Sequence, residues 1–206
     1  MSLWLRTRHA NAIVATLVFL VAGFLAAGDL SLPLPAILAS YGLAVPVVLL
    51  APLALSSVVG WGLMSGDEQL ERVSSRPIDG MDAALATGAA LVACLLALIA
   101  AGVTGSPSVA AAGRNALGYV GLMLVGRQLV GGRAGTLLPV GVAMLAAVFG
   151  GDASGRPRWW VWILAPPDSA FAWAIAWICL ALGVAATVAR SRLVLASRLA
   201  RTHGSD

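Results

Sequence analysis

The side chains best suited to charge chemistry are gathered in one stretch, residues 65–82. Ser65 and Glu68 have the spacing of a helix-capping box, and Glu68 and Arg72 have the favourable order for an ion pair on a helix surface. Pro77 then stops a helix, and the sequence predicts a short helix of about two turns between two apolar segments. The charges of this loop either keep a connector soluble or dock a partner protein. The residues proposed for docking are Glu68, Glu71, Arg72 and Arg76.

Other kinds of chemistry lack the residues that they need. The two histidines, His9 and His203, lie near the chain ends, whereas a zinc site needs clustered ligands. Ser56 and Ser57 have no base beside them, which a serine hydrolase requires. All 13 basic residues are Arg, so the lysine of a phosphate-binding loop is absent. The sequence therefore argues against an enzyme and predicts no cofactor and no metal.

Arg114 and Asn115 are polar residues inside an otherwise apolar stretch. An arginine at the bilayer centre costs about 2.5–3.5 kcal/mol on insertion scales. Arg114 lies close to one end of its stretch, so its stem can snorkel to the lipid headgroups. The other interpretation is that Arg114 and Asn115 face a polar cavity or an anionic group. Both stay candidates for a pathway or gate.

A second unusual segment covers residues 150–168, where a polar stretch precedes the apolar run 159–164. That run is too short to cross a membrane, and three of its six residues are Trp. Indole rings favour the boundary between membrane and water, because they are half apolar and half polar. We expect an interfacial or re-entrant segment on the outer face. Trp159 and Trp160 either anchor it or form a lid over an outward gate.

The elements that must position these residues are membrane-spanning helices. Sixty per cent of the residues are hydrophobic, only 11% are charged, and the mean hydropathy is +0.92. A soluble domain of 206 residues could not bury so much apolar surface. The sequence predicts an all-α protein with one membrane domain over residues 1–206, because water-free backbone must bond to itself. The six expected spans are 10–28, 36–64, 83–104, 109–126, 134–149 and 169–189, with Pro46 and Pro52 bending the second.

The distribution of arginines predicts the orientation. With the N-terminus inside, ten of the 13 arginines face the cytoplasm, as the positive-inside rule requires. Both termini and the loop 65–82 are then cytoplasmic, and we expect a multi-pass protein of the plasma membrane in contact with anionic lipid. Binding to nucleic acid is disfavoured, since no basic patch is interleaved with stacking aromatic residues.

This layout resembles the membrane (permease) subunit of a type-2 ABC exporter. Residues 1–11 look like the N-terminal interfacial helix of that family, residues 68–75 like its cytoplasmic coupling helix, and residues 159–164 like its outer re-entrant segment. The stretches 70–77 and 113–118 also look like permease-type proteins of high-GC Gram-positive bacteria. The resemblance covers nearly the whole chain but concerns topology, and the chain is somewhat short for the class.

The resemblance implies an export role in a larger complex. A separate cytoplasmic ATP-binding subunit would dock on the loop 65–82, and a second membrane subunit would pair with this chain as a homo- or heterodimer. Two other functions stay open. One is a non-transporting membrane scaffold or accessory subunit, which predicts no continuous polar path between helices. The other is a membrane enzyme acting on lipids, which predicts polar groups clustered at one membrane face.

Overall fold

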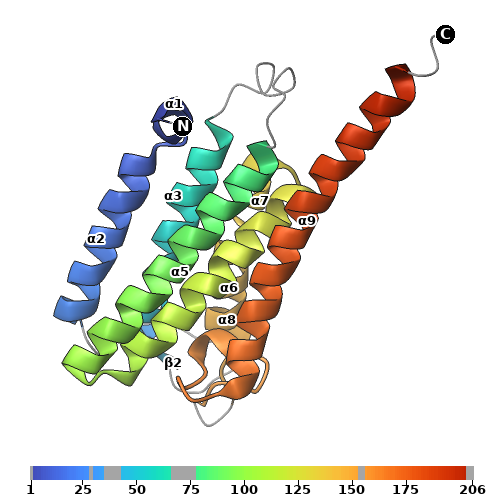
Figure 1. Ribbon diagram of the computed structural model, residues 1–206. Helices are drawn as coiled ribbons and strands as arrows, with labels where there is room; N and C mark the ends of the chain where they lie inside the picture. Colours follow the sequence, from blue (N-terminus) through green and yellow to red (C-terminus); the bar gives the residue numbers. More distant parts are fainter. Residues whose placement is uncertain (1, 28–29, 35–42, 66–77, 153–155, 203–206) are drawn as a thin grey trace.

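The computed structural model describes residues 2–27, 30–34, 43–65, 78–152 and 156–202 (Figure 1). The chain is mostly helical in these parts, and five segments are long and apolar enough to cross a membrane: 47–64, 78–104, 107–129, 132–149 and 170–190. The protein is therefore a helical polytopic membrane protein. The helices are α1 (Ser2–Thr7), α2 (Ala10–Ala27), α3 (Pro52–Met64), α5 (Ile78–Thr104), α6 (Pro107–Leu129), α7 (Gly132–Gly135), α8 (Leu138–Phe149) and α9 (Ala170–Thr202). The shorter elements are the strands β1 (Ser31–Leu34) and β2 (Leu43–Pro46) and the 3-10 turns η1 (Val47–Leu49) and η2 (Trp162–Leu164).

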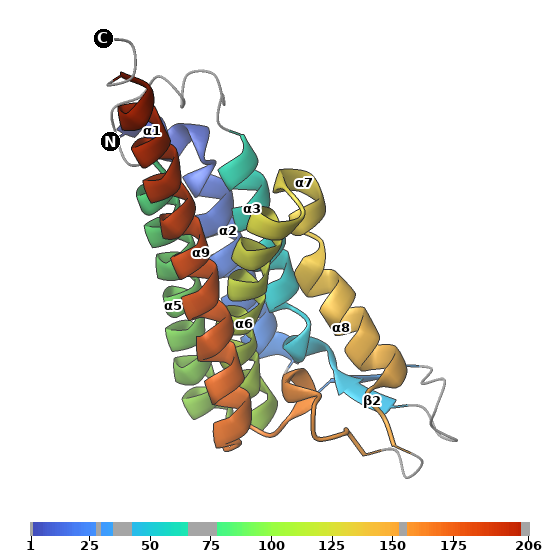
Figure 2. The same ribbon diagram turned by 90° about the vertical axis from the view of Figure 1, so that its right-hand side faces the viewer.

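The bundle has two distinct ends. The terminal end carries α1 and the C-terminal part of α9, which extends past the other helices (Figure 1). The strand end carries the antiparallel pair β1–β2, together with η2 and its flanking residues (Figures 1 and 2). The chain thus begins and, in its described part, finishes at the same end of the bundle.

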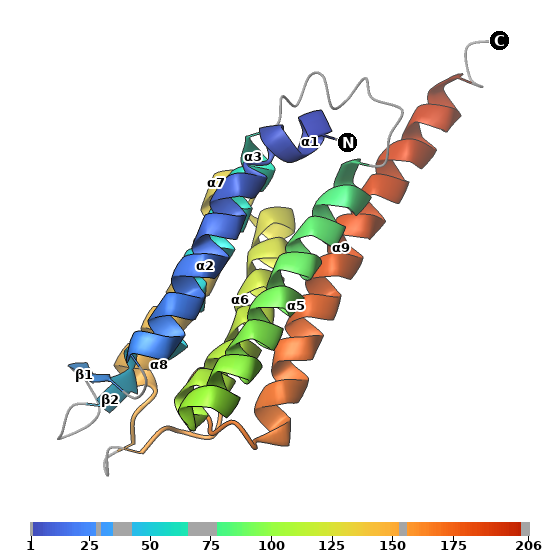
Figure 3. The same ribbon diagram turned by 60° about the vertical axis from the view of Figure 1, so that its left-hand side comes forward.

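Helix α6 forms the centre of the bundle. It packs against α3 on one side and against α5 and α9 on the other, and α2 lies beside α3 and α5 (Figure 3). Every residue from Ala111 to Gly121 is buried. Close packing depends on small residues: a Cβ at Gly121 would overlap the backbone of Cys179, and one at Gly183 would lie 2.7 Å from the Gly121 carbonyl oxygen. Glycine at these positions lets α6 and α9 approach closely.

The expected second span, 36–64, is wrong in its first part. Residues 43–46 form β2 and residues 47–49 form η1, so the α-helix begins only at Pro52. Pro46 ends the strand, and Pro52 occupies the first turn of α3, where its missing N–H costs no helix bond. Neither proline therefore bends a continuous helix. Residues 36–42 of this span lie outside the described residues.

The other helices keep their expected order but differ in length. The third helix begins at Ile78 instead of 83, which places Asp79 and Asp82 inside α5 instead of in the loop. The last helix runs on to Thr202, past the expected end at 189. The short helix expected within the loop, with the docking candidates Glu68, Glu71, Arg72 and Arg76, lies outside the described residues.

Candidate functional site

A cluster of buried polar side chains joins α6 to the strand end of the bundle. Arg114 is 0% exposed, although it lies within a membrane-spanning helix. Its guanidinium donates to the carbonyl oxygens of Trp162 at 2.8 Å, Pro166 at 2.9 Å and Ala165 at 3.0 Å. These carbonyls belong to η2 and the residues after it, where no regular helix satisfies them. Arg114 therefore fastens the segment 162–166 to the bundle.

Asn115 and Tyr119 extend this cluster to the start of α3. The Asn115 side-chain amide donates to the carbonyl oxygens of Ile163 at 2.9 Å and Leu49 at 3.4 Å. The Tyr119 hydroxyl also donates to the Leu49 carbonyl oxygen, at 3.3 Å. Leu49 ends η1, and the next turn does not use its carbonyl because the Leu53 amide bonds to Leu50. Side chains of α6 thus satisfy the backbone where the span is interrupted.

The ring of Trp162 packs against α6 beside this polar cluster. Trp162 is buried, and a Cβ at Gly118 would overlap its six-membered ring. The Tyr119 ring lies 6.0 Å from it, centroid to centroid. Of the three tryptophans in the run 159–164, this one packs in the core. Trp159 and Trp160, which the sequence offers either as an interfacial anchor or as a lid over a gate, are exposed.

A second buried cluster lies at the terminal end, around Arg8. The Arg8 guanidinium forms a two-bond ion pair with Asp82, with Nη2–Oδ2 at 2.9 Å and Nε–Oδ1 at 3.0 Å. It also donates to the Leu63 carbonyl oxygen at 3.0 Å. Both charged side chains are almost fully buried. A single residue thus joins the turn between α1 and α2 to the last turn of α3 and the first turns of α5.

Close packing supports this junction. A Cβ at Gly62 would lie 2.5 Å from the Arg8 carbonyl oxygen, so only glycine admits the turn here. His9 has a φ of 51°, and its ring stacks on Trp61 with the centroids 4.4 Å apart. Arg127 of α6 also donates to the Leu63 carbonyl, at 3.4 Å. The N-terminal turn, α3, α5 and α6 therefore meet at one place.

The sequence predicted these two clusters unequally. The cavity interpretation of Arg114 and Asn115 placed both inside the protein, whereas the snorkelling interpretation of Arg114 is wrong because the side chain is fully buried. Arg114 binds carbonyl groups, which are polar but uncharged. No pattern in the sequence pairs Arg8 with Asp82, which lies 74 positions further along the chain. Their only signal was that each lies next to the start of an apolar helix.

Among the residues that the structure describes, no three His, Cys, Asp or Glu side chains lie close enough together to hold a metal ion. No family model, curated protein or solved structure matches the chain. The functional assignment therefore rests on the residues and their geometry.

Proposed function

We propose that this chain is the membrane-spanning subunit of an ATP-driven exporter. A separate cytoplasmic ATPase docks on the loop 65–82 through Glu68, Glu71, Arg72 and Arg76, and a second membrane subunit completes the pathway. In this proposal the chain crosses the plasma membrane six times, with α2 as the first crossing. Helix α2 is a mainly apolar helix of 18 residues and buries Ile13, Leu20 and Phe24 against the bundle. Its length of about 27 Å is close to the thickness of the hydrocarbon core.

The observation that carries the proposal is the junction at Arg8. The predicted docking residues follow α3, which contains Leu63, and precede α5, which contains Asp82, and Arg8 bonds to both residues. A partner that pulls on the loop would therefore move α3, α5 and the N-terminal turn together. Rigid coupling of this kind is what a subunit without its own source of energy requires.

The positions of the charges support the orientation. Among the described residues, Arg6, Arg8, Arg127, Arg133 and Arg190 lie near the terminal end, and Arg114, Arg156 and Arg158 lie near the strand end. The positive-inside rule assigns the terminal end, and with it both chain termini, to the cytoplasm.

The strand end supplies a place for a gate. The carbonyl of Leu49 and the segment 162–166 are both bound by neighbouring residues of α6. Pro46 and Pro52 bracket η1, so this short turn can shift without breaking a regular helix. We propose that η1 and the segment with Trp159 and Trp160 move when the terminal end is displaced.

Affinity purification from native membranes tests the docking. The chain should recover an ATP-binding protein in stoichiometric amount, and the double reversal E71R/R72E should lower that recovery at least severalfold. The matched control is R156E/R158E, which reverses two charges at the strand end and should leave recovery unchanged. Absence of an ATP-binding protein, or equal recovery with the E71R/R72E variant, would contradict the proposal.

A non-transporting scaffold is the second candidate, and one observation favours it. The buried charged and amide side chains that the structure describes, Arg8, Asp82, Arg114 and Asn115, all bond within the chain. A polar path along the bundle would need such groups facing open space. Under this alternative, the purification recovers a membrane protein without an ATP-binding protein.

A further inference from the structure

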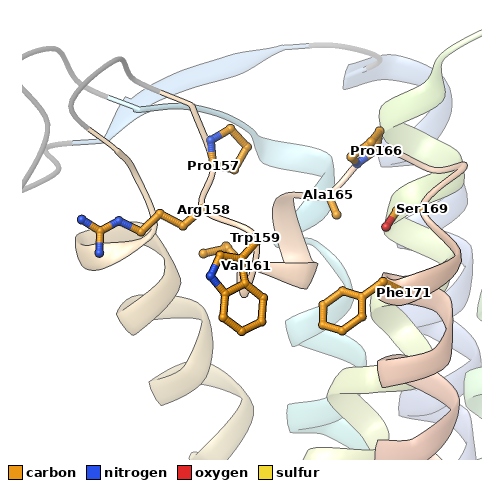
Figure 4. A pocket seen from close by; sticks show the side chains of 8 residues that line it. All are labelled: Pro157, Arg158, Trp159, Val161, Ala165, Pro166, Ser169 and Phe171. Carbon is orange, nitrogen blue, oxygen red and sulfur yellow. The ribbon is translucent and has the colours of Figure 1, made fainter.

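The strand end contains a cavity to which the proposed function assigns no ligand. Its volume is about 430 Å³, within the range of small-molecule sites, about 300–1,000 Å³. It lies between residues 157–161 and the beginning of α9 (Figure 4). Helix α8 diverges from α9 toward this end of the bundle (Figure 2).

Two aromatic rings flank the cavity. The rings of Trp159 and Phe171 have centroids 6.3 Å apart and are tilted by 52° (Figure 4). Trp159 is 81% exposed and Phe171 is 50% exposed, so neither ring is covered by the rest of the described chain. Phe171 lies at the first turn of the span 170–190, at the level where the hydrocarbon meets the headgroups. The bilayer therefore supplies the apolar partner for these rings.

The wall of the cavity behind the rings, formed by Ala165, Pro166 and Ser169, is held in place by hydrogen bonds. The carbonyls of Ala165 and Pro166 accept bonds from Arg114, and the Pro167 carbonyl accepts one from the Trp173 indole at 2.8 Å. The Ser169 hydroxyl caps α9 by accepting from the Ala172 amide at 3.3 Å. Because these polar atoms bond elsewhere, the wall presents mainly apolar surface to an occupant. A fixed wall lowers the entropic cost of ordering a flexible chain.

A single arginine, Arg158, lies among the described residues that line the cavity. Of these described residues it alone is charged, and its guanidinium points away from the two rings (Figure 4). A hydrocarbon chain lying against the two rings would therefore have a cation beyond one end. A planar guanidinium binds phosphate through paired hydrogen bonds. A ligand with a long apolar chain that ends in a phosphate is a phospholipid.

We propose that this cavity binds an anionic phospholipid of the leaflet at the strand end, with an acyl chain lying against the exposed faces of the Trp159–Phe171 pair and the phosphate on Arg158. The site depends neither on an ATPase nor on which side of the membrane this leaflet lies. A zwitterionic lipid fits the rings equally well but offers the guanidinium less net charge. Arg158 therefore determines the preference for anionic lipid, and the two rings determine how tightly either lipid binds.

Quenching of tryptophan fluorescence by brominated lipids tests the site. The chain is placed in phosphatidylcholine nanodiscs with a minor fraction of brominated phosphatidylglycerol or brominated phosphatidylcholine. Subtracting the W159F signal isolates Trp159. We expect Trp159 to be quenched at a lower fraction of phosphatidylglycerol than of phosphatidylcholine. R158Q should reduce this preference about tenfold, as expected for the loss of one charge-assisted interaction.

Three controls make the result decisive. R156Q removes an exposed charge from the same loop and should keep the preference. Trp177, which is exposed on α9 away from the cavity, should be quenched equally by both lipids. F171A should weaken the quenching of Trp159 by either lipid.

Equal quenching of Trp159 by the two lipids, or a preference retained in R158Q, would overturn the proposal. Loss of the preference on adding inorganic phosphate at the lipid's concentration would assign the site to a soluble anion instead.

Discussion

Arg8 and Arg114 are both buried, but each is stabilised in a different way. Arg8 has a carboxylate partner, whereas Arg114 is surrounded by peptide carbonyls. A carbonyl carries only a partial charge, so Arg114 needs several of them. The five donors of a guanidinium and its planar shape suit this role. Lysine, with a point charge on a flexible stem, could not bond to the whole segment 162–166.

The Arg8–Asp82 pair should be strongly coupled. D82N or R8Q alone leaves the other charge buried, and each should lower the free energy of unfolding by about 3–5 kcal/mol. The apolar double variant R8M/D82L should be less destabilised than the sum of the two single changes, because no charge remains buried. Thermal unfolding in detergent, analysed as a double-mutant cycle, measures this coupling. R6Q, which changes an exposed arginine two residues away, is the control. Additive effects of the two single changes would contradict the coupling.

Arg114 should be more sensitive to shape than to charge. R114Q removes the guanidinium from the carbonyls of Trp162, Ala165 and Pro166 and leaves that of Ala165 with no other donor among the described residues, at a cost of about 1–3 kcal/mol. R114K should recover only part of this loss. The melting temperature and the access of acrylamide to Trp162 should change together, since Arg114 holds the Trp162 carbonyl. R158Q provides the matched exposed arginine and should change stability by less than about 0.5 kcal/mol. Full rescue by lysine would contradict the carbonyl-binding role.

At the scale of elements, packing depends on glycine. The ring of Trp162 packs directly against Gly118, where a Cβ would overlap it. G118A should therefore displace the ring and loosen η2. We expect a lower melting temperature and a shift of Trp162 fluorescence toward that of a solvated indole. G88A on α5 is the control, because a Cβ there meets nothing within 4 Å and alanine favours a helix by up to about 1 kcal/mol. If the two variants behaved alike, the close approach at Gly118 would be refuted.

Hydropathy predicted most of the described helices but failed over residues 43–51. Residues 43–49 are as apolar as a helix interior, yet Pro46 and Pro52 interrupt any helix, and β2 pairs with β1 instead. An apolar run shows that a segment is buried or in lipid, but not which backbone form it takes. The strand pairing joins Ser31 to Pro46 and depends on a contact between distant residues, which periodicity cannot reveal.

The polar clusters were difficult to predict for a related reason. The predicted loop 65–82 includes Asp82 because Pro77 stops a helix, whereas α5 begins directly after this proline, at Ile78, and contains Asp82. The arginine count uses Arg8 only as one of the charges that set the topology. Burial of both depends on how α1, α3 and α5 meet in space. The positions of Arg114 and Asn115 within an apolar stretch were the only local sign of an internal polar cluster.

For the molecule as a whole, the proposed orientation places the terminal end of the bundle in the cytoplasm. In a background without Cys94 and Cys179, a single cysteine is placed at Arg133 or at Arg156. An impermeant maleimide on intact cells should label the cysteine at 156, at the strand end. The cysteine at 133, at the terminal end, should react only after permeabilisation. The opposite labelling would reverse the orientation and remove the loop 65–82 from the cytoplasm.

In the proposed function a partner ATPase acts on this chain through the loop 65–82. A photo-crosslinking amino acid at Glu71, activated in native membranes, tests this docking, with the same probe at Arg156 as the control. We expect a crosslink from position 71 to an ATP-binding protein and none from position 156. A crosslink from 71 only to lipid or to another membrane protein would contradict it.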